Sequence, residues 1–330
     1  MKKTLYRYAA RMGAAALLAS LTGHAAAQST LPLPPTVSEE ARAAVAANEK
    51  NPQPSPADLP ANRAFLNRFQ KEFGARQRER HAVEIAEQVM AGVPVRLITP
   101  KAGAKASDRR ILLNLHGGGF MGDSGSLTEN IPIAAETGIP VVAVLYPLSP
   151  EHQFPAALDQ ALAVYRDLLK THKPGEIGVY GTSAGGFLGG ELIARIKAEG
   201  LPMPAAFGMF AGGADFSRKS DSQLTSPRVD LSPLIKFYLG NTPPTDPIAS
   251  PLLGKLDGFP PTLCVTSTRD FLMSDTANFC RGLELAGVDN HLVVFDGLPH
   301  AFWAYIDAPE SRQAFSIMSR FLKAHLAGAR

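Results

Sequence analysis

The stretch VYGTSAGG, residues 179–186, decides the fold that we predict for this chain. The short segment 176–180, which leads into Ser183, is apolar and β-branched and therefore predicts a buried strand. Apolar residues recur at helical spacing over 187–199, so the stretch joins this strand to a helix. Glycines on both sides of Ser183 allow a sharp turn in which a Cβ would clash. We therefore expect the Ser183 hydroxyl to stand exposed above the end of the strand, at the N-terminus of the next helix.

A second glycine-rich segment, HGGGF at 116–120, follows the apolar run 111–115 and lies upstream of Ser183. Consecutive glycines leave backbone N–H groups unobstructed, and donors fixed in advance stabilise the oxyanion that forms when a carbonyl carbon becomes tetrahedral. The alternative is a phosphate-binding loop, but a lysine-bearing P-loop pattern is missing from this segment. The segment is therefore interpreted as an oxyanion loop.

A nucleophilic serine needs a base, and two histidines after Ser183 lie beside a predicted strand. His291 opens the run 291–295, which predicts an exposed residue at the start of an edge strand. His300 follows the same strand in a loop at its carboxyl end. Functional groups of open α/β sheets gather at the carboxyl ends of strands, so the sequence favours His300.

The base in turn needs a carboxylate to orient it. Asp270 directly follows the apolar strand predicted at 261–267, again at a carboxyl end. Asp275 is expected to cap the next helix at its N-terminus, and Asp296 competes because it precedes the His300 loop. The position of Asp270 at the end of the strand makes it the favoured acid.

Together these motifs are similar to those of a known family. HGGGF, GTSAGG, the trailing Asp270 and His300, and the segment YPLSPEHQFPAAL at 146–158 resemble the hormone-sensitive-lipase-like branch of the α/β-hydrolases. The resemblance covers about residues 80–325. It implies a serine carboxylesterase that acts by acyl transfer. It assigns the nucleophile, base and acid to Ser183, His300 and Asp270, and the oxyanion amides to Gly118, Gly119 and Ala184.

The chain departs from the family pattern in two places. Thr182 stands where the family usually has Asp before the serine, and Phe271 stands within the acid loop where Asp-Pro-Leu is usual. Neither change removes a catalytic group. We therefore expect the chemistry to be retained, and the rate and the substrate preference to be affected.

The expected substrates are small, short-acyl esters. Apolar side chains of the oxyanion loop, the cap and the His300 loop are predicted to bound the pocket: Phe120, Leu234, Phe237, Tyr238 and Trp303. The alternative is that the aromatic residues of the cap only fill a small satellite core. A lactonase or a peptidase on the same scaffold, or a non-catalytic binding protein with this fold, are the rival functions. No cofactor and no metal are expected, because the histidines are scattered without metal-ligand spacing.

The N-terminus has the pattern of a secretory signal peptide, residues 1–27. Four basic residues precede a short apolar stretch at 12–21, and a small-residue site, AAA at 25–27, follows it. Removal of this segment leaves 29 basic against 30 acidic residues from the 33 and 30 of the whole chain, a net charge of −1. The near-neutral charge predicts no nucleic-acid partner and no stable membrane anchor. The signal-peptide pattern predicts an exported enzyme, periplasmic or secreted. It says nothing of the oligomeric state.

Beyond the signal, residues 28–80 are expected to form a Pro/Ala-rich segment and N-terminal cap helices, with an apolar helix face within 62–80. Residues 81–330 are expected to form an α/β-hydrolase domain, a mainly parallel, doubly wound sheet of about eight strands that begins with a hairpin. A cap insertion is predicted at about 212–250, where the alternation of strands and helices stops. For Cys264 and Cys280, buried free thiols are favoured over a disulfide.

Overall fold

The computed structural model describes residues 32–48, 50, 53–55, 57–101, 109–226 and 230–327. The predicted signal peptide, 1–27, lies outside them. The chain divides into two compact units, Met1–Pro35 and Thr36–Arg330. Every helix and strand described below belongs to the second unit.

The core of that unit is an eight-stranded sheet with the order β1-β2-β4-β3-β5-β6-β7-β8. An antiparallel hairpin of β1 and β2 forms one edge, β2 pairs antiparallel with β4, and all further pairs are parallel. This confirms the predicted mainly parallel sheet. The strands are β1 (Val83–Met90), β2 (Val93–Pro100), β3 (Ile111–Leu115), β4 (Val141–Val144), β5 (Ile177–Thr182), β6 (Ala206–Phe210), β7 (Thr262–Arg269) and β8 (Asn290–Pro299).

Strand β5 lies near the middle of the sheet, between β3 and β6. All its residues are buried, as are those of β3 and β6, because helices cover both faces of the sheet. The parallel register places Gly181 of β5 opposite Leu115 of β3 and opposite Met209 of β6. The segments that follow β3 and β5, which are the glycine-rich loop and the Ser183 turn, therefore emerge side by side at the carboxyl edge.

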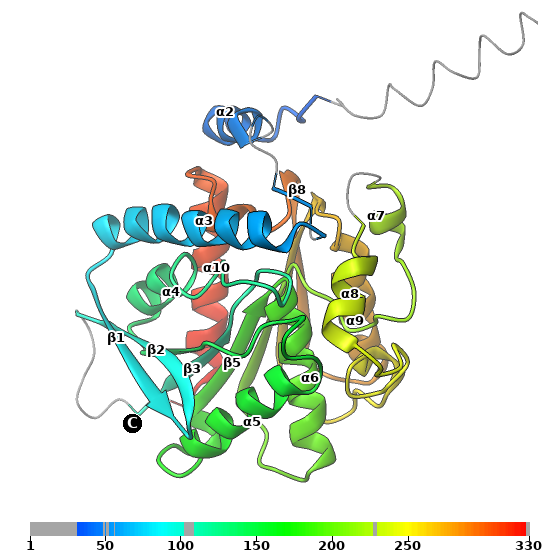
Figure 1. Cartoon of the computed structure of the whole chain (residues 1–330). Coiled ribbons are helices and arrows are strands. Elements are labelled where there is room, and N and C mark those ends of the chain that lie inside the picture. Colours follow the sequence, from blue (N-terminus) through cyan, green and yellow to red (C-terminus); the bar gives the residue numbers. More distant parts are fainter. Residues whose placement is uncertain are drawn as a thin grey trace, which may run out of the picture. The chain divides into compact units, whose positions relative to one another are not determined.

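Helices form layers on the two faces of the sheet. Helices α4 and α10 pack against each other on one face, whereas α5 and α6 pack together on the other (Figure 1). Helix α9 packs on β7 and β8. Their bounds are α4 (Asn130–Thr137), α5 (Ala156–Leu168), α6 (Ala184–Ala198), α9 (Met273–Leu285) and α10 (Pro309–His325).

Further helices come from the two regions predicted to form a cap. The N-terminal region gives α2 (Glu39–Asn48) and α3 (Leu59–Arg80), and residues between β6 and β7 give α7 (Asp221–Leu224) and α8 (Ser232–Leu239). Helix α3 begins three residues before the predicted 62–80. Asp58 accepts a hydrogen bond from the Ala61 amide, and Pro60 occupies the first turn, where its missing N–H costs nothing.

The two cysteines are free and buried, as favoured from the sequence. Cys280 Sγ lies 2.7 Å from Asn290 Oδ1, to which it donates. His291 is exposed on β8, the edge strand, as predicted. Among the helices described, none is both long enough and apolar enough to span a bilayer.

Candidate active site

Ser183 occupies a strained turn between β5 and α6. Its φ of 58° and ψ of −122° are rarely adopted by a residue with a side chain. The neighbouring glycines make the turn possible. A Cβ on Gly181 would lie 2.1 Å from the Gly185 carbonyl oxygen, and one on Gly185 would lie 1.9 Å from the Leu115 oxygen. The backbone therefore requires glycine at both positions, and it raises the serine above the strand end.

His300 joins Ser183 to Asp270 through its two ring nitrogens. His300 Nε2 lies 2.9 Å from Ser183 Oγ, and Nδ1 lies 2.7 Å from Asp270 Oδ1. Asp270 is buried, and it also accepts hydrogen bonds from the Leu272 amide at 2.8 Å and from Thr266 Oγ1 at 3.1 Å. The serine, the imidazole and the carboxylate thus form one continuous chain of hydrogen bonds, the arrangement of a nucleophile, a base and an orienting acid.

The glycine-rich loop beside Ser183 has left-handed backbone at consecutive residues. Gly118 has φ 117°, Gly119 has φ 63° and Phe120 has φ 61°. The Gly118 carbonyl accepts from the amides of Met121 and Gly122, which turns the N–H of the same peptide, that of Gly119, the opposite way. None of the turn and loop backbone hydrogen bonds of the described residues is donated by the N–H groups of Gly118, Gly119 or Ala184.

Comparison with known proteins agrees with this geometry. Residues 112–304 match the sequence profile of the family described as having the alpha/beta hydrolase fold. The chain belongs to the α/β-hydrolase family. An esterase of Acinetobacter venetianus is 32% identical over 232 residues, which cover 66% of this chain and 76% of the relative. An acetyl-hydrolase of Streptomyces hygroscopicus is also 32% identical, over 66% of this chain and 76% of its own.

A solved structure supports the same placement within the family. An esterase from the bacterial hormone-sensitive lipase family matches with a TM-score of 0.76 and 26% identity, over 88% of this chain and 99% of the other. These findings make the protein a carboxylic ester hydrolase of the hormone-sensitive-lipase-like type.

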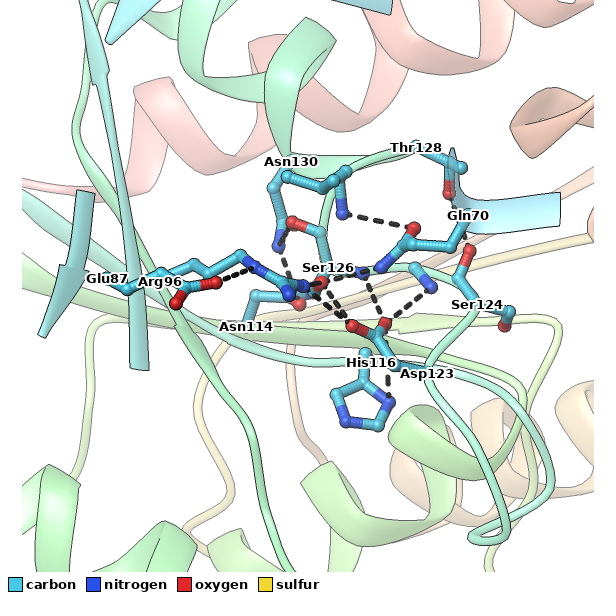
Figure 2. A network of polar contacts seen from close by, with 12 residues as sticks. Gln70, Glu87, Arg96, Asn114, His116, Asp123, Ser124, Ser126, Thr128 and Asn130 are labelled. Carbon is cyan, nitrogen blue, oxygen red and sulfur yellow. Dashed lines mark hydrogen bonds and ion pairs between the residues drawn. The ribbon is translucent and has the colours of Figure 1, made fainter. Parts of the chain in front are cut away.

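A polar network joins the segment that follows the glycine-rich loop to β2 and α3 (Figure 2). Asp123 binds Arg96 Nη1 at 2.9 Å and also contacts the Ser126 hydroxyl, while its Oδ1 lies 3.8 Å from His116 Nδ1. Burial alone would raise the Asp123 pKa, but His116, Ser126 and Arg96 together hold it below its ordinary value. Gln70 of α3 donates to Ser126, so the cap helix takes part in the network.

Helix α3 also contacts the glycine-rich loop and the segment that follows His300. Arg63 donates to the Met121 carbonyl at 2.9 Å and to the Ser149 carbonyl at 3.0 Å, and it pairs with Glu151. Phe69 packs on Tyr305 at 5.8 Å between ring centroids, and the Tyr305 hydroxyl donates to the His300 carbonyl. The predicted apolar face of this helix therefore lies against the segment that follows His300.

The five predicted pocket residues differ in position. Leu234 lies against the oxyanion loop, since a Cβ on Gly119 would be 2.9 Å from Leu234 Cδ1. Phe120 and Tyr238 stack at 3.6 Å, and both are almost fully buried, as is Trp303. These three side chains offer almost no surface to a ligand, so they belong to the packed interior and do not line a pocket. Phe237 is half-buried.

The predicted cap role of Asp275 is wrong. The residue before α9 is Leu272, which makes no side-chain cap, and Asp275 lies within the first turn. Its carboxyl accepts from Ser220 and Gln223 of the α7 segment. Burial raises the pKa of Asp275 to about 6. The competing acid, Asp296, binds Thr36 and Thr268 instead of His300.

Sequence reasoning missed several residues at the site. Phe271, noted only as a departure from the family pattern, packs on the His300 ring at 4.2 Å between centroids. Its position next to Asp270 was a usable signal. Thr266, Tyr305 and Glu129 also contact the site, and no local pattern distinguishes them in the sequence.

Proposed function

We propose that this enzyme is a serine carboxylesterase of small, short-acyl esters that works through Ser183, His300 and Asp270. The hydrogen-bond chain from Ser183 Oγ through His300 to Asp270, at 2.9 and 2.7 Å, is the observation that carries the proposal. It places a base within proton-transfer distance of a hydroxyl on a strained turn.

In the first half of the reaction, Ser183 Oγ attacks the ester carbonyl carbon while its proton passes to His300 Nε2. The negative charge that develops on the carbonyl oxygen is stabilised by the amides of Gly118, Gly119 and Ala184. His300 then donates its proton to the leaving alcohol oxygen as the C–O bond breaks, which leaves the acyl group on Ser183.

In the second half, His300 takes a proton from water, which attacks the acyl carbon, and returns it to Ser183 Oγ as the acid leaves. Asp270 holds the imidazole with its Nδ1 protonated and stabilises the imidazolium in both halves. The two additional donors on Asp270, from Leu272 and Thr266, fix the carboxylate in the position that this role requires.

Three observations favour short acyl groups. Leu234 lies over Gly119, Phe271 packs on His300, and the stacked rings of Phe120 and Tyr238 fill the space behind the oxyanion loop. Bulky side chains close to the reacting atoms leave little room for a long chain. The similarity to an acetyl-hydrolase agrees with this preference.

The test is hydrolysis of p-nitrophenyl acetate, butyrate, octanoate and palmitate by the enzyme and by Ser183→Ala and His300→Ala. We expect the highest kcat/KM on acetate or butyrate and loss of turnover in both variants. Highest activity on palmitate would refute the short-acyl preference, and activity retained by folded Ser183→Ala would refute the triad.

We further propose that the enzyme is exported, on the strength of the signal-peptide pattern at residues 1–27. Expression of the full chain in a Gram-negative host should yield a mature protein that begins at Gln28. An uncleaved protein that keeps residues 1–27 and stays in the cytoplasm would contradict this proposal.

A further inference from the structure

Glu129 is a buried carboxyl group that the proposed mechanism does not use. It directly precedes α4, at the end of the segment that begins with the oxyanion loop, and only 2% of its surface is exposed. Its Oε1 accepts a hydrogen bond at 3.2 Å from Nε1 of Trp303. Trp303 lies in a short 3-10 helix, Phe302–Ala304, that begins two residues after His300. Glu129 is thereby bound to the loop that carries the base.

The same carboxyl also interacts with a residue of the Ser183 turn. Glu129 Oε2 and Thr182 Oγ1 are both buried, and neither has a partner of good hydrogen-bond geometry. The two groups are nevertheless close enough for the Thr182 hydroxyl to lower the pKa of Glu129. Thr182 is the residue before Ser183, so the same carboxyl faces the turn that carries the nucleophile.

Glu129 also borders the oxyanion segment itself. A Cβ on Gly125 would lie 3.0 Å from Glu129 Oε2, and the Glu129 amide donates to the Gly125 carbonyl. The side chain therefore lies close to Thr182 and Trp303, which are distant from it in the sequence, and to Gly125 of its own segment. A buried polar group in such a place fixes the distance between the segments it joins.

We propose that Glu129 is a positioning residue whose carboxyl sets the distance between Ser183 and His300 by joining Thr182 to Trp303. The proposal rests on the proposed function, because it assigns roles to Ser183 and His300. Glu129 itself contacts neither substrate nor the reacting atoms. It acts through the backbone of the two segments that it joins.

The charge of this carboxyl changes near neutral pH. Burial raises the pKa of Glu129 to about 7, Thr182 and Trp303 lower it, and the nearby Asp123 of the same segment raises it. Tyr180 of β5 is the other titratable group that interacts with it. In the described part of the chain no basic side chain forms an ion pair with Glu129.

The chain offers a direct spectroscopic readout, because Trp303 is its only tryptophan. Ionisation of the carboxyl that accepts the indole N–H changes the environment of that single fluorophore. Emission of the enzyme should therefore shift between pH 5 and 9 with a midpoint at about 7. Glu129→Gln keeps the acceptor and the shape but cannot ionise, so its emission should not shift. His300→Gln, which removes the nearby base, should retain the shift.

Kinetics test the positioning role. We expect Glu129→Ala to lower kcat about 10- to 100-fold and to change KM by no more than about twofold. The kcat of Glu129→Gln should stay within about threefold of the wild-type value. Trp303→Phe, which lacks the N–H, should lower kcat about tenfold. The matched control is Glu191→Gln, since Glu191 is an equally buried carboxyl whose hydrogen-bond partner, Tyr238 of α8, lies outside the Ser183 turn and the His300 loop. The kcat of Glu191→Gln should stay within about twofold of the wild-type value.

Two outcomes would overturn the proposal. One is kcat within twofold of the enzyme for both Glu129→Ala and Trp303→Phe, with circular dichroism showing that both are folded. The other is an emission shift that persists in Glu129→Gln. The fluorescence result does not depend on turnover, and Ser183→Ala tests the triad separately. Failure of this proposal is therefore distinguishable from failure of the proposed function.

Discussion

Two buried carboxyl groups, Asp270 and Glu129, bind residues of the loop that begins at His300, and their hydrogen bonding differs. Both oxygens of Asp270 are satisfied, by His300, the Leu272 amide and Thr266. Glu129 has one donor, from Trp303, and its second oxygen has none of good geometry. Donors to the charged form favour ionisation, whereas burial without them favours the neutral form. Two carboxyls buried in one site thus suit different tasks.

The largest effect should come from Asp270→Asn, which keeps the shape of the side chain. Its amide can donate a hydrogen bond to His300 Nδ1, whereas the carboxylate only accepts one from it. We expect kcat on p-nitrophenyl acetate to fall by about 10⁴-fold, because the imidazole then adopts the wrong tautomer. Asp296→Asn, at the competing acid, is the matched control and should keep kcat within about twofold. A loss of less than tenfold in Asp270→Asn would remove the distinction between the two carboxyls.

The next effect concerns stability against pH. The folded pKa of Glu129, about 7, lies above its ordinary value of 4.5, so the neutral form is favoured by folding. The resulting stabilisation is complete below pH 4.5 and is lost as pH rises through 7. Relative to Glu129→Gln, the free energy of unfolding of the enzyme should therefore fall by about 3 kcal/mol between pH 4.5 and 7.5. Urea denaturation of both proteins over this range measures it. A constant difference would contradict the prediction.

A smaller effect is expected at Thr266, which donates to the second oxygen of Asp270. Thr266→Val removes this donor from a buried charged acceptor, at a cost of about 1–2 kcal/mol, or roughly a tenfold decrease in kcat. Thr266→Ser keeps the hydroxyl and should restore most of the activity. Equal kcat values for the two variants would show that Asp270 does not depend on this hydrogen bond.

The smallest effect should come from a carboxyl at the surface. Asp307 pairs with Arg80 at 2.6 Å, and about half of each side chain is exposed. Arg80→Ala should lower the free energy of unfolding by less than about 1 kcal/mol, because water and salt screen such pairs. Thermal unfolding in low and high salt measures this. A decrease in the free energy of unfolding of more than about 2 kcal/mol would contradict the prediction that an exposed carboxyl contributes less than a buried one.

The sequence predicted what is local in this fold. The strands and the Ser183 turn each depend on residues within a few positions, so pattern and residue type were sufficient. The predicted ends of the helices and strands were less accurate. Strand β7 continues to Arg269, beyond the apolar run, because Ser267 and Thr268 bond to the neighbouring strand region. Exposed polar residues gave no signal for that extension.

Contacts between distant segments could be predicted only where motifs marked both partners, as for Ser183, His300 and Asp270. Glu129 and Trp303 are 174 positions apart, and only the crossing of loops at the carboxyl edge brings them together. The error at Asp275 has the same origin. A local rule predicts that an acid near a helix start caps that helix, but the donors of Ser220 and Gln223, from a different segment, occupy its oxygens.

Arg63 has a consequence for engineering the cap. Its guanidinium binds the carbonyls of Met121 and Ser149, so α3 and the oxyanion loop share hydrogen bonds as well as apolar contacts. A chimaera that takes residues 59–80 from a relative would therefore alter the oxyanion loop together with substrate preference, unless it keeps arginine at position 63. We therefore expect an exchange of this helix that changes specificity to change the rate as well.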